Sequence, residues 1–227
     1  MRNNFRSQPI SLAVISEGDT EGWYLRQLKS SERIDFDIFP KEGRNLVGMK
    51  NKLQHLLSQD IYDYIVCLVD MDTKLDGAEK TKYQAFRQFA QKHENVHIIE
   101  SQPCFEYWFY LHKADFSARY FKTWKNELPL KPEILKIIPA YEKSKNFYNL
   151  KSGQGIYNLL KPSLIYAAKN SFKLKNNDKY HYCQFFTLFG LILCNKVKQV
   201  NETDFFNCLN EHQLCDFISN FLLTYTK

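Results

Sequence analysis

YIVCLVDMD, residues 64–72, begins with the most strand-like run of the chain and ends in Asp70, Met71 and Asp72. A short apolar run rich in β-branched residues is typical of a strand that is buried on both faces of a parallel sheet. ISLAVIS, residues 10–16, has the same character and is followed by Glu17. We therefore predict two buried strands, each ending at acidic residues.

Helix-like segments alternate with strand-like runs across the first half of the chain. Strands are predicted at residues 10–16, 34–40, 64–69 and 96–99. Four strand-to-helix alternations predict an α/β fold with a mostly parallel, four-stranded, Rossmann-like sheet flanked by helices. Thr20 is expected to cap the first helix and Pro103 to begin the fourth. The residues at helical spacing in the four helices are Trp23, Tyr24 and Leu28; Leu46, Met49, Leu53, Leu56 and Leu57; Tyr83, Phe86, Phe89 and Ala90; and Phe105, Trp108, Phe109 and His112.

The strand signal disappears after residue 112. Helical patterns return at residues 156–168, 180–197 and 203–226. We predict an α/β catalytic domain over residues 1–112 and a basic, mainly helical extension over residues 113–227. The extension either packs on the first domain as a separate part or forms one compact unit with it.

Composition predicts a folded protein of the cytoplasm. Hydrophobic residues make up 44% of the 227 residues, enough for a sizeable core. The six cysteines form no C-x-x-C pair and lie largely in apolar segments, which favours reduced core thiols. No signal-peptide pattern opens the sequence, and the most apolar stretch, residues 185–194, has about half the length that a bilayer requires. We expect a soluble protein without membrane association.

Positive charge is concentrated in the middle of the chain. The net charge is +6, and residues 111–180 hold 14 basic and 5 acidic residues. Such a segment either faces a polyanion or solvates exposed helices and loops. Its aromatic residues, which either stack on unpaired RNA bases or belong to the core, are Tyr120, Phe121, Trp124, Tyr141, Phe147 and Tyr148. The candidate nucleic-acid contacts are Lys122, Lys125, Lys143 and Lys145.

Acidic residues follow two of the predicted strands. Glu17 and Glu21 come after the first strand, and Asp70 and Asp72 come after the third. The carboxyl ends of parallel strands meet at one edge of a sheet, where repulsion between carboxylates is costly unless a cation neutralises them. Oxygen ligands without His or Cys indicate Mg²⁺ or Mn²⁺. Gly18 is expected to let the backbone turn sharply there. The alternative is that these side chains only cap helices and meet solvent.

The pattern of Glu17-Gly18 with Asp70-x-Asp72 resembles the Toprim fold of topoisomerases, primases and related nucleases. The wider sequence is similar to the RloB family of bacterial proteins linked to restriction and phage defence. The similarity runs through ISEGDTEGWYLRQL, VCLVDMDT and ESQPCFEYWFYLH, and less clearly through PAYEKSKNFY and Ala167-Ala168-Lys169. Gln102 stands where RloB-like proteins usually carry Asn, which puts that side chain's role in doubt.

This resemblance implies roles for individual residues. Glu17 is implied as general acid or base at a scissile phosphate, Asp70 and Asp72 as metal ligands, and Glu21 as a ligand of a second ion. Glu106 is a further catalytic candidate, because it begins a helix at the end of the fourth strand. Its alternative role is simply to face a helix dipole there.

The function implied is a Mg²⁺- or Mn²⁺-dependent nuclease that acts in phage defence with a partner ATPase. RNA, including transfer RNA, is preferred over DNA by analogy with related effectors. A topoisomerase is not expected, because the 227 residues leave no obvious room for the separate domain that supplies a nucleophilic tyrosine. The main rival is a non-catalytic regulatory subunit of a defence ATPase complex. Phosphotransfer through an Asp nucleophile would instead place the Asp pair on the first strand. Self-association stays open.

Overall fold

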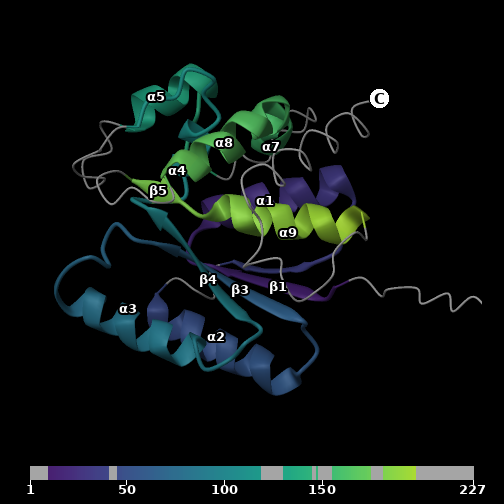
Figure 1. Ribbon diagram of the computed structural model, residues 1–227, viewed down its shortest axis with the longest axis vertical. Helices are drawn as coiled ribbons and strands as arrows, with labels where there is room; N and C mark the ends of the chain where they lie inside the picture. Colours follow the sequence, from purple (N-terminus) through teal and green to yellow (C-terminus); the bar gives the residue numbers. More distant parts are fainter. Residues whose placement is uncertain are drawn as a thin grey trace, which may run out of the picture.

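The fold is a helix-flanked sheet, seen in a computed structural model (Figure 1). The sheet has five strands in the order β2-β1-β3-β4-β5. Its strands are β1 (Leu12–Ser16), β2 (Asp37–Pro40), β3 (Tyr64–Asp70), β4 (Val96–Gln102) and β5 (Tyr182–Cys183). The first four are parallel, as predicted. The structure describes residues 10–40, 45–118, 130–144, 147, 155–174 and 181–197.

The fifth strand was not predicted. β5 has only two residues and pairs antiparallel with the end of β4, Cys183 opposite Ser101 and Tyr182 opposite Gln102. A strand this short has no alternating pattern that sequence analysis could detect. It brings the extension onto the same edge of the sheet that carries the end of β4.

Helices cover both faces of the sheet. Figure 1 shows α2 and α3 on one face and α1 and α9 on the other, with α4, α5, α7 and α8 lying beyond α1 and α9. The bounds are α1 (Asp19–Glu32), α2 (Leu46–Gln59), α3 (Gly77–Ala90), α4 (Tyr107–Tyr110), α5 (Leu130–Ile137), α7 (Ile156–Leu160), the 3-10 turn η1 (Lys161–Ser163), α8 (Leu164–Leu174) and α9 (Phe185–Val197). None of the helices in the described residues is both long and apolar enough to cross a membrane.

Alternate residues of each central strand face opposite layers, because successive side chains of a strand point to opposite faces. In β1, Leu12 and Val14 belong to one apolar cluster, whereas Ala13 and Ile15 belong to the other. The second cluster packs against α2 and α3, and the first packs against the remaining helices. This two-sided burial explains why β1 and β3 read as continuous apolar runs.

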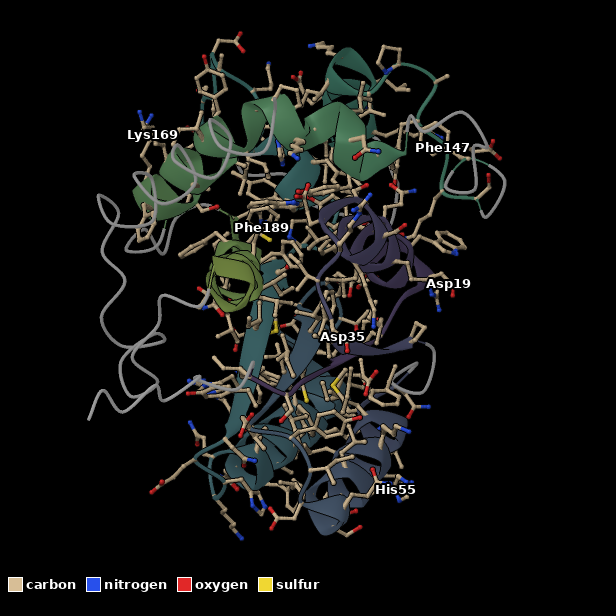
Figure 2. The ribbon with its side chains drawn as sticks, turned by 90° about the vertical axis from the view of Figure 1, so that its right-hand side faces the viewer. Asp19, Asp35, His55, Phe147, Lys169 and Phe189 are labelled. Atoms are coloured by element: carbon tan, nitrogen blue, oxygen red, sulfur yellow. The ribbon has the colours of Figure 1, made fainter. Side chains whose placement is uncertain are left out.

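Aromatic rings join the two predicted segments in one core. The ring of Tyr24 on α1 lies 5.7 Å from that of Tyr157 and 5.6 Å from that of Phe185, both nearly perpendicular to it. Phe189 on α9, labelled in Figure 2, is fully buried and contacts Trp108. Edge-to-face packing of this kind adds to the free energy of burial. The boundary at residue 112 stays a prediction, but side chains from both sides of it share this core.

Several predicted helix limits are wrong. The N-cap of α1 is Gly18, and Thr20 lies inside the first turn. The helix expected from Pro103 onward is only the four-residue α4, which begins at Tyr107. The pattern at residues 156–168 is divided by η1, because Pro162 has no N–H with which to continue a helix. The pattern at residues 203–226 lies outside the described residues.

Candidate functional site

Four carboxylates gather where β1, β3 and β4 end. Glu17 directly follows β1, Asp70 is the last residue of β3, Glu21 lies in the first turn of α1, and Glu106 is the residue before α4. We call these four residues the acidic cluster. Figure 2 labels Asp19, which precedes Glu21 on α1, and Phe147 on the same side of the molecule in that view.

Glu17 and Asp70 are joined directly. The backbone N–H of Asp70 donates to Glu17 Oε2 over 2.9 Å. The ammonium of Lys74 donates to the same oxygen over 2.9 Å and to the Asp70 carbonyl over 2.7 Å. Lys74 is only 5% exposed. Burial raises the pKa of Glu17, and the charge of Lys74 opposes that shift. One ammonium therefore ties the ends of the two central strands together.

The Asp70 carboxylate is half-buried among like charges. Its Oδ1 accepts a hydrogen bond from the backbone N–H of Phe105 over 2.8 Å. Burial, followed by the charges of Glu21 and Glu106, holds the pKa of Asp70 well above its ordinary value. Hydrogen bonding to the loop after β4 thus brings the fourth strand into the same site.

Glu21 is 2% exposed, and burial together with the charge of Glu106 raises its pKa to about 7. Gly18 makes room for it, because a Cβ atom built on Gly18 would lie 2.5 Å from Glu21 Oε2. The sharp turn expected at Gly18 is not the reason for glycine. Its φ of −107° and ψ of 169° are extended backbone, which any residue adopts. Glycine is needed at position 18 because a larger residue would collide with the Glu21 carboxylate.

Glu106 is 1% exposed and forms an ion pair with the ammonium group of Lys143. Its Oε1 accepts hydrogen bonds from Lys143 over 2.7 Å, from Thr20 over 3.3 Å and from Tyr141 over 3.4 Å. Burial alone would raise the pKa of Glu106. The charge and hydrogen bond of Lys143, together with hydrogen bonds from the Cys104 thiol and the backbone N–H of Glu106, hold that pKa below its ordinary value. The charge of Glu106 in turn raises the pKa values of Glu21 and Asp70.

The second carboxylate oxygen of Glu106, Oε2, could accept a further hydrogen bond or bind a cation. Oε2 is buried, and no donor in the described residues meets it in hydrogen-bond geometry, although the nearby Cys104 thiol helps to lower the pKa of Glu106. A buried carboxylate oxygen of this kind is costly without a partner.

Asp72 is the most exposed of the predicted ligands. It is exposed in the loop after β3, and its charge makes only a small contribution to the raised pKa of Glu17. Within the described part of the chain, no three Asp, Glu, His or Cys side chains are arranged so that they could hold a metal ion as they stand. The metal site stays a prediction.

The predicted nucleic-acid contacts have separate outcomes. Lys143 pairs with Glu106, so its ammonium is engaged inside the acidic cluster. Lys122, Lys125 and Lys145 lie outside the described residues. Tyr141 is a core residue that contacts Phe109 and Phe147. The other aromatic candidates, which also lie outside the described residues, are Tyr120, Phe121, Trp124 and Tyr148.

Sequence reasoning missed two groups that complete the site. Lys74 lies four residues beyond Asp70 and has no pattern that separates it from a surface lysine. The Thr20 hydroxyl was interpreted as a helix cap, but it donates to Glu106, a residue 86 positions away. Only the path of the chain reveals such pairs. The one available signal was that Lys74 lies within four residues of an acidic strand end.

The comparison with protein families gives one result. A family model described as "RloB-like protein" matches residues 12–195, a range that includes the acidic cluster, Lys74 and Lys143. No curated protein and no solved structure gives a significant match to the chain.

Proposed function

Because the chain belongs to the RloB-like family, we propose that it is a metal-dependent nuclease that cleaves phosphodiester bonds of RNA as an effector in defence against phage. The observation that supports this proposal is the convergence of Glu17, Glu21, Asp70 and Glu106 at three neighbouring strand ends. Clefts at the carboxyl ends of parallel strands are where such sheets usually place their chemistry. A Toprim arrangement of the site is part of the proposal.

The chemistry of the cluster suits a hard divalent cation. All of its side-chain ligands are carboxylates, and the repulsion that raises the pKa values of Asp70 and Glu21 is the kind that a cation relieves. Glu17, Asp70, Asp72 and Glu21 would hold Mg²⁺ or Mn²⁺. The ion would supply charge neutralisation at a phosphate and an acidified water.

Glu17 is proposed as the general acid or base. Its carboxylate lies at the end of β1, and burial raises its pKa above the ordinary value of 4.5, the direction that favours proton exchange by a general acid or base. Glu106, whose pKa is lowered, would stay charged. The pKa values of the two carboxylates are therefore shifted in opposite directions, as expected where one group exchanges protons and the other supplies fixed charge.

RNA is proposed as the substrate because residues 111–180 combine 14 basic with 5 acidic residues and are rich in aromatic rings. DNA is the less favoured polymer. A partner ATPase that restrains or activates the nuclease is proposed from the family resemblance. In this view the basic segment brings the polymer to the edge of the sheet where the acidic cluster lies.

One observation favours a second function, that of a non-catalytic regulatory subunit of a defence ATPase complex. Lys74 neutralises Glu17 and Lys143 neutralises Glu106. Ion pairs with a buried carboxylate or ammonium can simply hold loops together. In that function the acidic cluster would only stabilise the fold around a binding surface for the ATPase.

Replacement of Glu17 by Gln separates the two functions. This change keeps the shape of the side chain and removes its charge, so cleavage should fall by about 10²-fold or more while the fold persists. Asp70→Asn should act in the same direction. The assay measures cleavage of transfer RNA and DNA with Mg²⁺ or Mn²⁺, in the presence of the partner ATPase once it is identified.

Glu79→Gln is the matched control, because Glu79 is a partly exposed residue of α3 that pairs with Lys82. It should cleave like the wild type, and circular dichroism should confirm the fold of each variant. Equal cleavage by the wild type, Glu17→Gln and Asp70→Asn would refute the catalytic assignment and leave the regulatory function in its place.

A further inference from the structure

Lys74 lies where a positive ion would bind the acidic cluster. Its ammonium is 2.9 Å from Glu17 Oε2 and 2.7 Å from the Asp70 carbonyl oxygen. The backbone N–H of Lys74 donates to the Met71 carbonyl over 3.2 Å, so a turn brings the side chain back over the end of β3. The lysine thus reaches the cluster from the loop that also carries Asp72.

Glu17 Oε2 is already occupied. It accepts both the Asp70 N–H and the Lys74 ammonium. The side chain of Lys74 is 5% exposed and that of Glu17 is 12% exposed, so solvent screens this pair weakly. A second cation at the same oxygen would meet the repulsion of the ammonium at close range. Binding of a divalent cation by Glu17 and retention of Lys74 are therefore mutually unfavourable.

The loop around Lys74 is suited to release it. Asp72, Thr73, Leu75 and Asp76 are all exposed, so these neighbours have little burial to lose if the loop moves. Lys74 is the residue by which this loop is held to the cluster. Breaking the ion pair with Glu17 and the hydrogen bond to the Asp70 carbonyl would free the side chain to reach an anion outside the cluster, such as a phosphate of the polymer.

We propose that Lys74 is a built-in counter-ion that holds the acidic cluster closed and has to leave Glu17 before a divalent cation binds there. The inference rests on the proposed metal-dependent function and concerns the regulation of that site. Lys74 sets the affinity of the cluster for cations low in the resting protein. A phosphate that attracts the released ammonium raises that affinity, which couples cation binding to substrate binding.

Mn²⁺ binding to Lys74→Met tests this proposal without any cleavage assay. The variant keeps much of the side-chain volume and removes the charge, so Mn²⁺ should bind roughly tenfold or more tightly than to the wild type. Electron paramagnetic resonance of free Mn²⁺ gives the Kd in the absence of nucleic acid. Lys82→Met, which removes a charge from exposed α3, is the matched control and should leave the Kd unchanged.

Two outcomes would overturn the proposal in different ways. Equal or weaker Mn²⁺ binding by Lys74→Met, with binding by the wild type intact, refutes the counter-ion and leaves the metal-dependent function standing. An absence of Mn²⁺ binding by both proteins refutes the metal site and the counter-ion together. Binding by Lys74→Met alone supports the proposal.

The wild type supplies a second measurement in case Lys74→Met does not fold. Amine acylation followed by mass spectrometry of peptides reports how accessible each lysine is. Lys74 should label slowly in metal-free protein and faster once Mn²⁺ is bound, whereas Lys82 should label equally in both conditions. Unchanged labelling of Lys74 with Mn²⁺ bound would refute its release.

Discussion

Glu21 illustrates how a single buried carboxyl couples stability to pH. Burial and the charge of Glu106 raise its pKa to about 7, above the ordinary value of 4.5. A raised pKa means that the unfolded state gives up its proton first as the pH rises. The stability contributed by protonated Glu21 is therefore complete below about pH 4.5 and is lost as the pH rises to about 7.

Glu21→Gln should remove that part of the pH dependence. In metal-free protein with a chelator present, the free energy of unfolding of the wild type should fall relative to that of the variant, by roughly 3 kcal/mol, between about pH 4.5 and pH 7. Urea denaturation at a series of pH values measures it. Each protein also holds Glu17, Asp70, Glu106, Lys74 and Lys143 near this position. Because the charge of Glu21 raises the pKa of Asp70, the difference between the two curves reports Glu21 together with its interaction with Asp70. Parallel curves would contradict the assignment.

At the scale of elements, α7 fixes α1 and so fixes the helix that carries Glu21. The Tyr157 hydroxyl donates to the buried Glu32 over 2.8 Å, and the Tyr157 backbone N–H donates to Gln27 Oε1 over 3.0 Å. Lys161 completes the contact with an ion pair to Glu32 over 2.8 Å. The contact is close, because a Cβ atom built on Gly155 would lie 2.5 Å from Gln27.

Tyr157→Phe should weaken this contact. The change keeps the ring in the core but removes one donor from a buried carboxylate, which should lower the free energy of unfolding by about 1–3 kcal/mol. Tyr166→Phe on α8 is the matched control, because Tyr166 is 44% exposed and should change stability little. Chemical denaturation of both variants measures the difference. Equal stability of the two would mean that the hydroxyl of Tyr157 contributes nothing.

At the scale of the whole molecule, we expect residues 113–180 to dominate affinity for RNA. Lysines that neutralise phosphates release counter-ions, so affinity should fall steeply with added salt. Charge reversal of Lys122, Lys125 and Lys145 should weaken binding and flatten the salt dependence by roughly 0.7 per lost contact for a single strand. Fluorescence anisotropy with a labelled single-stranded RNA measures both quantities.

Lys80→Glu is the control for this experiment, because Lys80 is an exposed residue of α3 on the opposite side of the sheet from α1. Lys143 is left unchanged in the test, because its loss would leave the buried Glu106 carboxylate without its cationic partner and so destabilise the fold. Affinity that is insensitive to salt, or equal effects of Lys80 and the three lysines, would refute the polyanion-binding role of this segment.

The alternation of strands and helices could be read from the amino-acid sequence, because periods of 2 and 3.6 residues depend on near neighbours. β1, β3, α2 and α3 were predicted for that reason, and with them the arrival of Glu17 and Asp70 at one edge of the sheet. The position of β5 and the pairing of Lys143 with Glu106 were decided by the tertiary structure. So was Lys74: whether a lysine meets solvent or a buried carboxylate depends on where a turn sends its side chain, and no local pattern contains that information.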